Sequence, residues 1–218
     1  MLNTRLMITL AAGSVATIAS ADVAVSTFTF SDLNSEYFTA DGVTGLYTAR
    51  AGAATSGDVT RVMEVGIAET AEYTPAFAND DASDADVIFE MNISNISALS
   101  ADGDGYFQIT DLDGDLVTGN LVGTWTRAFA GAPVLFFNGT LSDVTFDDAG
   151  DGLFEGTDGL GFDLTPFLLN SELEGGLVQV SFGVDSFFDQ SFEGFNSQFS
   201  GTIVPTPGAA ALLLGAGG

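Results

Sequence analysis

Residues 86–96 read Asp-Val-Ile-Phe-Glu-Met-Asn-Ile-Ser-Asn-Ile, and this stretch decides the fold class. Apolar side chains stand at every second position, at Val87, Phe89, Met91 and Ile93. Successive side chains of a β-strand point to opposite faces, so an alternation of period two is typical of a strand with one buried face. The stretch therefore predicts a strand that covers a core.

The same alternation recurs on both sides of this stretch. Further strands are predicted at residues 22–30, 37–40, 46–50, 58–68, 106–110, 116–129, 134–146, 153–155, 177–188 and 192–204. Roughly nine to eleven strands with almost no helix predict an all-β fold, and the spacing favours an antiparallel β-sandwich of jelly-roll type.

Acidic, glycine-containing segments separate the predicted strands. Turns are predicted at residues 32–36, 41–42, 102–105, 111–115, 130–133 and 147–152, a long surface loop at 69–85, and the one helical segment at 165–173. Asp-Gly pairs suit hairpin turns because glycine accepts the positive φ that these turns need. We therefore expect consecutive strands to be joined mainly by short turns.

Charge limits the possible partners. The chain of 218 residues has 30 acidic residues against four arginines, a net charge of −26, with no histidine and no cysteine. Such a surface repels nucleic acid and anionic membrane faces, and it favours cations. The composition also excludes disulfides, thiol chemistry, a Ser-His-Asp triad and zinc held by His or Cys.

The first 21 residues have the pattern of a secretory signal peptide. Arg5 precedes a mostly apolar run over residues 6–18, and Ala19 and Ala21 are the small residues that signal peptidase requires. We expect cleavage between Ala21 and Asp22 and export through the Sec pathway. Residues 22–203 would then form one acidic domain.

Residues 204–218, VPTPGAAALLLGAGG, form a distinct tail. The motif Val204-Pro205-Thr206-Pro207, followed by apolar residues 209–218, resembles the C-terminal sorting signal of PEP-CTERM proteins. In that family an arginine cluster follows the apolar helix. The sequence shows no such cluster here, so we expect a truncated form of the signal.

The resemblance is limited to the tail, and it carries expectations about location and partners. It implies export, transient membrane association and processing by an exosortase-type transpeptidase. It also implies display at the cell surface or in an extracellular polysaccharide matrix. It implies nothing specific about residues 22–203.

The acidic turns contain the candidate metal ligands, which are Asp102, Asp104, Asp111, Asp113 and Asp115. The last three have the i, i+2, i+4 spacing with which an EF-hand calcium loop begins. Leu116 and Val122 stand where that loop has glycine and a bidentate glutamate. Two interpretations stay open: a Ca²⁺ site, shared with Asp102 and Asp104 across neighbouring turns, or ordinary turns on a solvated surface without a cofactor.

Three functional hypotheses follow. We expect an exported, non-enzymatic protein of the cell surface or extracellular matrix. The alternative is a secreted module that binds calcium or carbohydrate. Carbohydrate could stack on aromatic side chains that lie outside the core, and the candidates are Tyr106, Trp125 and the Phe pairs at 136–137 and 187–188. The third hypothesis is a carboxylate-based glycoside hydrolase. Such an enzyme needs two opposed acids, for example Glu90 and Asp185.

Overall fold

The computed structural model describes residues 26–64, 67–79, 85–168, 173–183 and 187–205. Its strands are β1 (Ser26–Phe38), β2 (Gly45–Arg50), β3 (Ser56–Glu64), β4 (Ile67–Tyr73), β5 (Asp86–Ser94), β6 (Ser100–Thr110), β7 (Leu116–Thr126), β8 (Val134–Asp147), β9 (Leu153–Glu155), β10 (Gly161–Asp163), β11 (Leu173–Gly183) and β12 (Phe192–Pro205). Two short helices, η1 (Phe77–Asn79) and α1 (Thr165–Leu168), complete the described part. The described strands pair antiparallel throughout, which confirms the all-β, antiparallel prediction.

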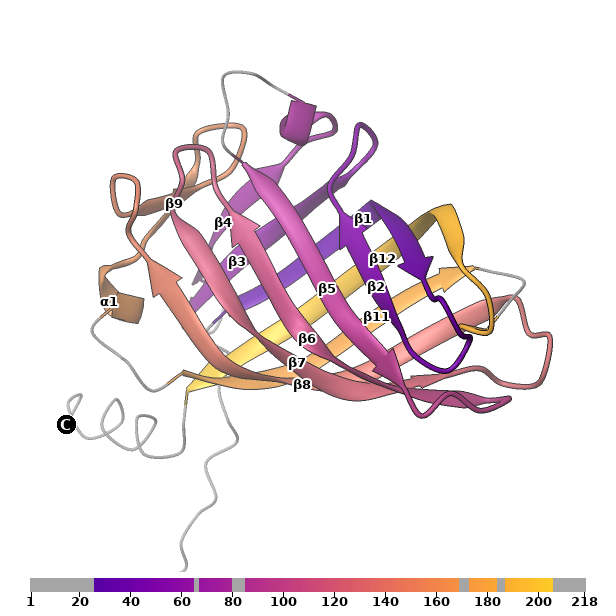
Figure 1. Cartoon of the computed structure of the whole chain (residues 1–218). Coiled ribbons are helices and arrows are strands. Elements are labelled where there is room, and N and C mark those ends of the chain that lie inside the picture. The colour runs from indigo at the N-terminus through magenta and orange to yellow at the C-terminus, as the bar shows by residue number, and fades with distance from the viewer. Residues whose placement is uncertain (1–25, 65–66, 80–84, 169–172, 184–186, 206–218) are drawn as a thin grey trace, which may run out of the picture.

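Eight of the strands close into a barrel (Figure 1). Their order is β1-β2-β5-β6-β7-β8-β11-β12, and β12 returns to pair with β1. In this seam Ser26 lies opposite Ile203, and Tyr37 lies opposite Phe192. The predicted jelly-roll sandwich is therefore wrong, because the pairing of the first and last strands joins the sheet to itself.

Two of the predicted turns lie inside strands. Residues 32–36 belong to β1, where Asp32 has a φ of 56° and makes an irregularity before the pairing with β12 resumes at Leu33. Residues 102–105 belong to β6 and pair with both neighbouring strands. The predicted loop at 69–85 begins only after Tyr73, since β4 runs to that residue.

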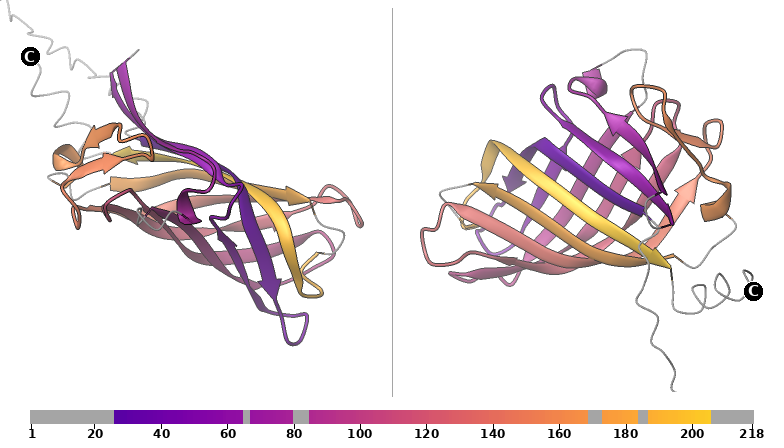
Figure 2. Two further views of the ribbon diagram at one scale, coloured as in Figure 1. Left: turned by 90° about the horizontal axis from the view of Figure 1, so that it is seen from above. Right: turned by 180° about the vertical axis from the view of Figure 1, so that it is seen from behind.

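The β1 strand divides the sheet. Residues 26–31 pair with β3 and residues 34–38 pair with β2, both on the edge opposite β12. Thr55, in the connection between β2 and β3, is fully buried, and its hydroxyl donates to the carbonyl oxygen of Asp32 at 2.8 Å. Because the division lies at Asp32, β3 and β4 leave the barrel wall as a two-stranded extension (Figure 2).

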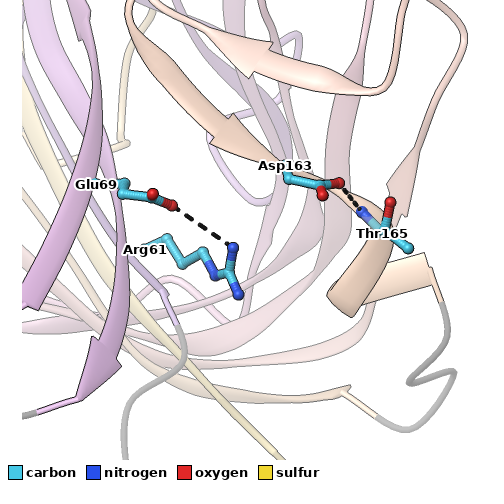
Figure 3. Close-up of polar contacts among 4 residues, drawn as sticks. All are labelled: Arg61, Glu69, Asp163 and Thr165. Atoms are coloured by element: carbon cyan, nitrogen blue, oxygen red, sulfur yellow. Dashed lines mark hydrogen bonds and ion pairs between the residues drawn. The ribbon is translucent and has the colours of Figure 1, made fainter.

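The extension packs beside the β9–β10 hairpin and α1 at one end of the barrel (Figure 1), which we call the β9 end. On β3 the Arg61 guanidinium lies 3.6 Å from the Glu69 carboxylate and 5.6 Å from the centroid of the Phe167 ring in α1. Across from it, the carboxylate of Asp163 accepts the N–H of Thr165 (Figure 3). The opposite end carries the β1–β2 hairpin, and we call it the hairpin end.

Aromatic side chains fill much of the barrel interior. Phe28, Phe89, Phe107 and Phe199, from four different strands, form a stacked group in which the Phe28 and Phe199 centroids are 5.6 Å apart. A second group, nearer the hairpin end, contains Tyr47, Trp125, Phe137, Phe182 and Phe188. All nine side chains are buried, so packing alone can hold this cysteine-free domain.

A row of glycines makes room for the second group. Gly103, Gly123 and Gly139 lie opposite one another on β6, β7 and β8. If each glycine carried a Cβ atom, the distance from that atom to the Phe137 ring would be 3.1 Å for Gly103, 2.8 Å for Gly123 and 2.6 Å for Gly139. A Cβ at Gly103 would also lie 3.0 Å from Trp125 Nε1. The two rings therefore lie across a strip of wall that has no side chains.

Closing this strip should destabilise the barrel. A Cβ at Gly123 would lie 2.5 Å from Gly139 Cα as well as against Phe137, so we expect Gly123→Ala to lower the free energy of unfolding by about 1–3 kcal/mol. A Cβ at Gly52 would lie 3.7 Å from its nearest neighbour, Asn34 Cβ. Gly52→Ala should therefore change the free energy of unfolding by less than about 0.5 kcal/mol. Urea denaturation of both variants measures the difference, and equal losses would contradict the packing argument.

Candidate metal centre

The turn from Asp111 to Asp115 joins β6 to β7 at the β9 end. It is closed by the N–H of Asp111, which donates to the carbonyl oxygen of Asp115 at 2.9 Å. One carboxylate oxygen from each of Asp111, Asp113 and Asp115 lies within 4.8 Å of the other two. Asp111 and Asp115 are fully buried, whereas Asp113 is exposed. The structure thus brings together the three residues that the i, i+2, i+4 spacing singled out.

The other two predicted ligands do not join them. Asp102 and Asp104 are exposed and lie within β6, and the Asp102 carboxylate accepts the side-chain N–H of Asn95 at 2.7 Å. Asp111 stands nine positions after Asp102, which corresponds to roughly 30 Å along the extended chain. The open interpretation in which Asp102 and Asp104 share a calcium site with Asp111 therefore finds no support, since the described residues group only Asp111, Asp113 and Asp115.

The Asp111 carboxylate organises its own turn. Its Oδ1 accepts the N–H groups of Asp113, Gly114 and Asp115 at 3.1, 2.9 and 2.8 Å. Its Oδ2 accepts the N–H of Glu155 at 2.8 Å. A buried carboxylate is costly unless it is hydrogen-bonded, and these four donors meet that requirement.

Asp115 fastens the same turn to the connection between β8 and β9. Its Oδ1 accepts the N–H of Gly150 at 2.6 Å, and its Oδ2 accepts the N–H of Gly152 at 2.9 Å. The Asp113 carboxylate lies so close to Gly150 that a Cβ there would collide with it. Residues 147–152 were predicted only as a separate acidic turn, and their place beside Asp115 could not be read from the sequence.

Negative charge is concentrated around these groups. The pKa of the Asp111 carboxyl is raised to about 7, mainly because the group is buried. Hydrogen bonds from the N–H groups of Glu155 and Asp113 lower this pKa, and the neighbouring Asp113 carboxyl raises it. Burial also raises the pKa of Asp115 and of Glu155, and neighbouring carboxylates, including that of Asp151, raise both further. Within the described residues, none of these acids has an arginine partner within 4 Å.

This arrangement suits a hard divalent cation. Calcium takes six to eight oxygen ligands from carboxylates, carbonyls and water. Each carboxylate oxygen of Asp115 uses one lone pair on a backbone N–H, and the exposed Asp113 carboxylate adds further capacity. One oxygen from each of the three carboxylates gives three ligands, fewer than the six to eight that Ca²⁺ takes, so water would complete the shell.

The remaining predicted site residues are placed as follows. Val204 and Pro205 form the end of β12, opposite Glu174 and Leu173. Thr206, Pro207, Ala19, Ala21, Asp22 and Asp185 lie outside the described residues. Among the described residues, no helix is long and apolar enough to cross a membrane.

The aromatic residues considered for sugar stacking do not form one platform. Trp125, Phe137, Phe187 and Phe188 are buried in the core, and only Tyr106 and Phe136 are exposed. Tyr106 lies opposite Asn120 of β7, whereas Phe136 lies opposite Thr126. Six residues along β7 correspond to roughly 20 Å, too far for adjacent stacking of one sugar.

Comparison with known protein families, with characterised proteins and with solved structures finds no match for this chain.

The two buried contacts of Asp115 yield a stability prediction. In Asp115→Asn one acceptor oxygen becomes an NH₂ group that faces a backbone N–H, so we expect a loss of about 1–3 kcal/mol in the free energy of unfolding. Asp113→Asn removes the same charge from an exposed side chain and should cost less than about 0.5 kcal/mol. Chemical denaturation in the presence of a chelator compares the two. A larger loss for Asp113→Asn would show that Asp115 does not fasten the turns together.

Proposed function

We propose that this chain is an exported, non-enzymatic protein of the cell surface or extracellular matrix, and that its barrel binds Ca²⁺ through Asp111, Asp113 and Asp115. The observation that carries the calcium proposal is the convergence of three carboxylate oxygens within 4.8 Å. A bound cation would offset their mutual repulsion and would hold the β6–β7 turn against the β8–β9 connection. Calcium would therefore act on the stability of the domain.

Export and surface display are supported by the two ends of the sequence. Residues 1–21 have the signal-peptide pattern, and residues 204–218 resemble the PEP-CTERM sorting signal. The proposed partners are accordingly signal peptidase and an exosortase-type transpeptidase, with extracellular polysaccharide as the surrounding matrix. The excess of negative charge argues against nucleic acid as a partner.

A non-enzymatic role is supported by the hydrogen bonds that the buried carboxylates of Asp111 and Asp115 make. The carboxylates of Asp111 and Asp115 accept backbone N–H groups that hold two turns together. Carboxyl groups committed in this way are poorly placed to exchange protons with a substrate. The pair thus serves architecture and cation binding better than acid–base chemistry.

Calcium should raise the melting temperature of the purified domain. Ligand at about 100 times its Kd stabilises a folded protein by about 2.7 kcal/mol, and calcium sites of extracellular modules have Kd values of about 10⁻⁴–10⁻³ M. We expect Asp113→Ala to lose most of the effect, because it removes the exposed ligand and spares the buried contacts. Differential scanning calorimetry with CaCl₂ and with NaCl at matched ionic strength measures it.

The control for charge is Asp104→Asn, which neutralises an exposed acid of β6 outside the cluster. This variant should respond to calcium as the unaltered domain does. If CaCl₂ and NaCl raise the melting temperature of the unaltered domain equally, the effect is general screening and the calcium proposal fails.

Sorting is tested by two forms produced in a bacterium that has an exosortase. In both, mass spectrometry should find a mature N-terminus at Asp22. We expect a form in which the rest of an apolar helix and an arginine cluster follow Gly218 to be held in the membrane fraction before processing near residues 204–207. A form ending at Pro205, which leaves β12 whole, should be released without that step. Identical fractionation of both forms would remove the sorting proposal and leave the calcium proposal intact.

A further inference from the structure

The outside of the barrel wall carries a row of neutral polar side chains across β7, β8, β11 and β12, which lie side by side (Figure 1). Thr124 lies opposite Asn138, Asn138 lies opposite Gln179, and Gln179 lies opposite Ser200. Residues directly opposite each other on paired strands project from the same face of the sheet. The first three are exposed and Ser200 is half-buried, so the row faces solvent.

An aspartate stands at each end of this row. On β6, Asp102 lies opposite Thr124. On the other side Ser200 lies opposite Thr29 of β1, and Thr29 lies opposite Asp58 of β3. The chain has 30 acidic residues, yet the five positions of the row between the two aspartates carry no charge. Depletion of charged residues is the compositional mark of the centre of an interface, so this part of the wall is suited to contact.

A second row, next to the first, adds apolar surface. It runs from Thr126 to Phe136, Ser181 and Gln198 on the same four strands. Phe136 is 46% exposed, although large aromatic side chains are normally buried. Val122, on β7 beyond the first row, is 57% exposed. We call the two rows together with Val122 the neutral face.

The polar side chains of the neutral face keep much of their hydrogen-bonding capacity. Gln179 Nε2 donates to Asn138 Oδ1 at 3.1 Å. Within the described part of the chain this is the one hydrogen bond of the two amides, which leaves Gln179 Oε1 free to accept and Asn138 Nδ2 free to donate. The hydroxyls of Thr124 and Ser200 make no hydrogen bond to any described residue. The face therefore offers donors and acceptors side by side without charge.

The neutral face is small. Four strands spaced about 4.8 Å apart, with the stretch from Val122 to Thr126 along β7, give an outline of roughly 20 Å by 15 Å. A standard protein interface buries about 800 Å² on each partner, which is more than this outline provides. A thin polymer that contacts a few residues at a time needs no larger area.

We propose that the neutral face binds a neutral polysaccharide. Sugar hydroxyls both donate and accept, and they would pair with the amides of Asn138 and Gln179 and with the hydroxyls beside them. The ring of Phe136 would cover the apolar C–H face of one sugar. The aspartates at the ends of the row would repel an anionic polymer, and a cationic one would gather on the acidic surface elsewhere. The inference gives the proposed matrix setting a contact surface and rests on that part of the proposed function, whereas it is independent of calcium.

The experiment is native affinity electrophoresis of the purified protein with a chelator present. The gels contain a neutral polymer (dextran, hydroxyethylcellulose, laminarin or galactomannan) or the anionic polymer alginate. We expect at least one neutral polymer to lower the mobility of the protein at least twofold relative to a polymer-free gel, and alginate to have no effect. Unchanged mobility in all four neutral gels, or retardation by alginate alone, would overturn the proposal.

Variants assign the surface. Asn138→Asp keeps an acceptor for Gln179 Nε2 but places a charge in the face, and Phe136→Ala removes the ring. Together they should weaken polysaccharide binding by about tenfold. The matched control combines Asn92→Asp with Phe38→Ala, which make the same changes at exposed positions outside the face and should bind normally. Equal binding by the two double variants contradicts the assignment.

Sedimentation velocity tests whether a second copy of the chain covers the face instead. We expect a monomer, and a dimer that dissociates when Asn138→Asp and Phe136→Ala are combined would overturn the polysaccharide proposal. The export proposal has its own readout, since fractionation of the two tail forms does not involve this face. Failure of the gels with normal fractionation would therefore remove this inference alone.

Discussion

The pairing of β1 with β12 is the constraint on which the rest of the structure depends. It joins residues 26–37 to residues 192–203, and it turns an open sheet into a barrel without a free edge at this seam. A barrel of eight strands has an interior just wide enough for side chains to fill. The rings of Phe28 and Phe199 therefore meet across the seam, and Phe137 and Trp125 fit only because Gly103, Gly123 and Gly139 present no side chains.

Local alternation predicted most strands but not their closure. The residues of β5 and β8 show period two because one face of each is buried, and this pattern is visible in any short window of sequence. A sandwich and a barrel produce the same alternation, so the choice between them depends on contacts between β1 and β12, far apart in the chain. The turn predicted at residues 32–36 failed for the same reason, because pairing with β12 holds that segment extended apart from the irregularity at Asp32.

The candidate metal centre was predictable only in part. The i, i+2, i+4 spacing indicated that Asp111, Asp113 and Asp115 lie close together, because all three belong to a single turn. The N–H donors from residues 150, 152 and 155 belong to another part of the chain, and no local pattern connects them to Asp115 or Asp111. The turn predicted at Asp102 and Asp104 was wrong because Gly103 lies within β6, where it makes room for Trp125 and Phe137. From the sequence alone, an Asp-Gly pair is typical of a turn.

The two ends of the barrel use the same acidic composition in different ways. At the β9 end the carboxylates of Asp111 and Asp115 are buried and hold two turns together, so a cation bound there would be coupled to folding. At the hairpin end Glu36 and Glu193 are exposed, and the barrel does not depend on them for packing. This separation follows from burial, since both ends carry charge of the same sign.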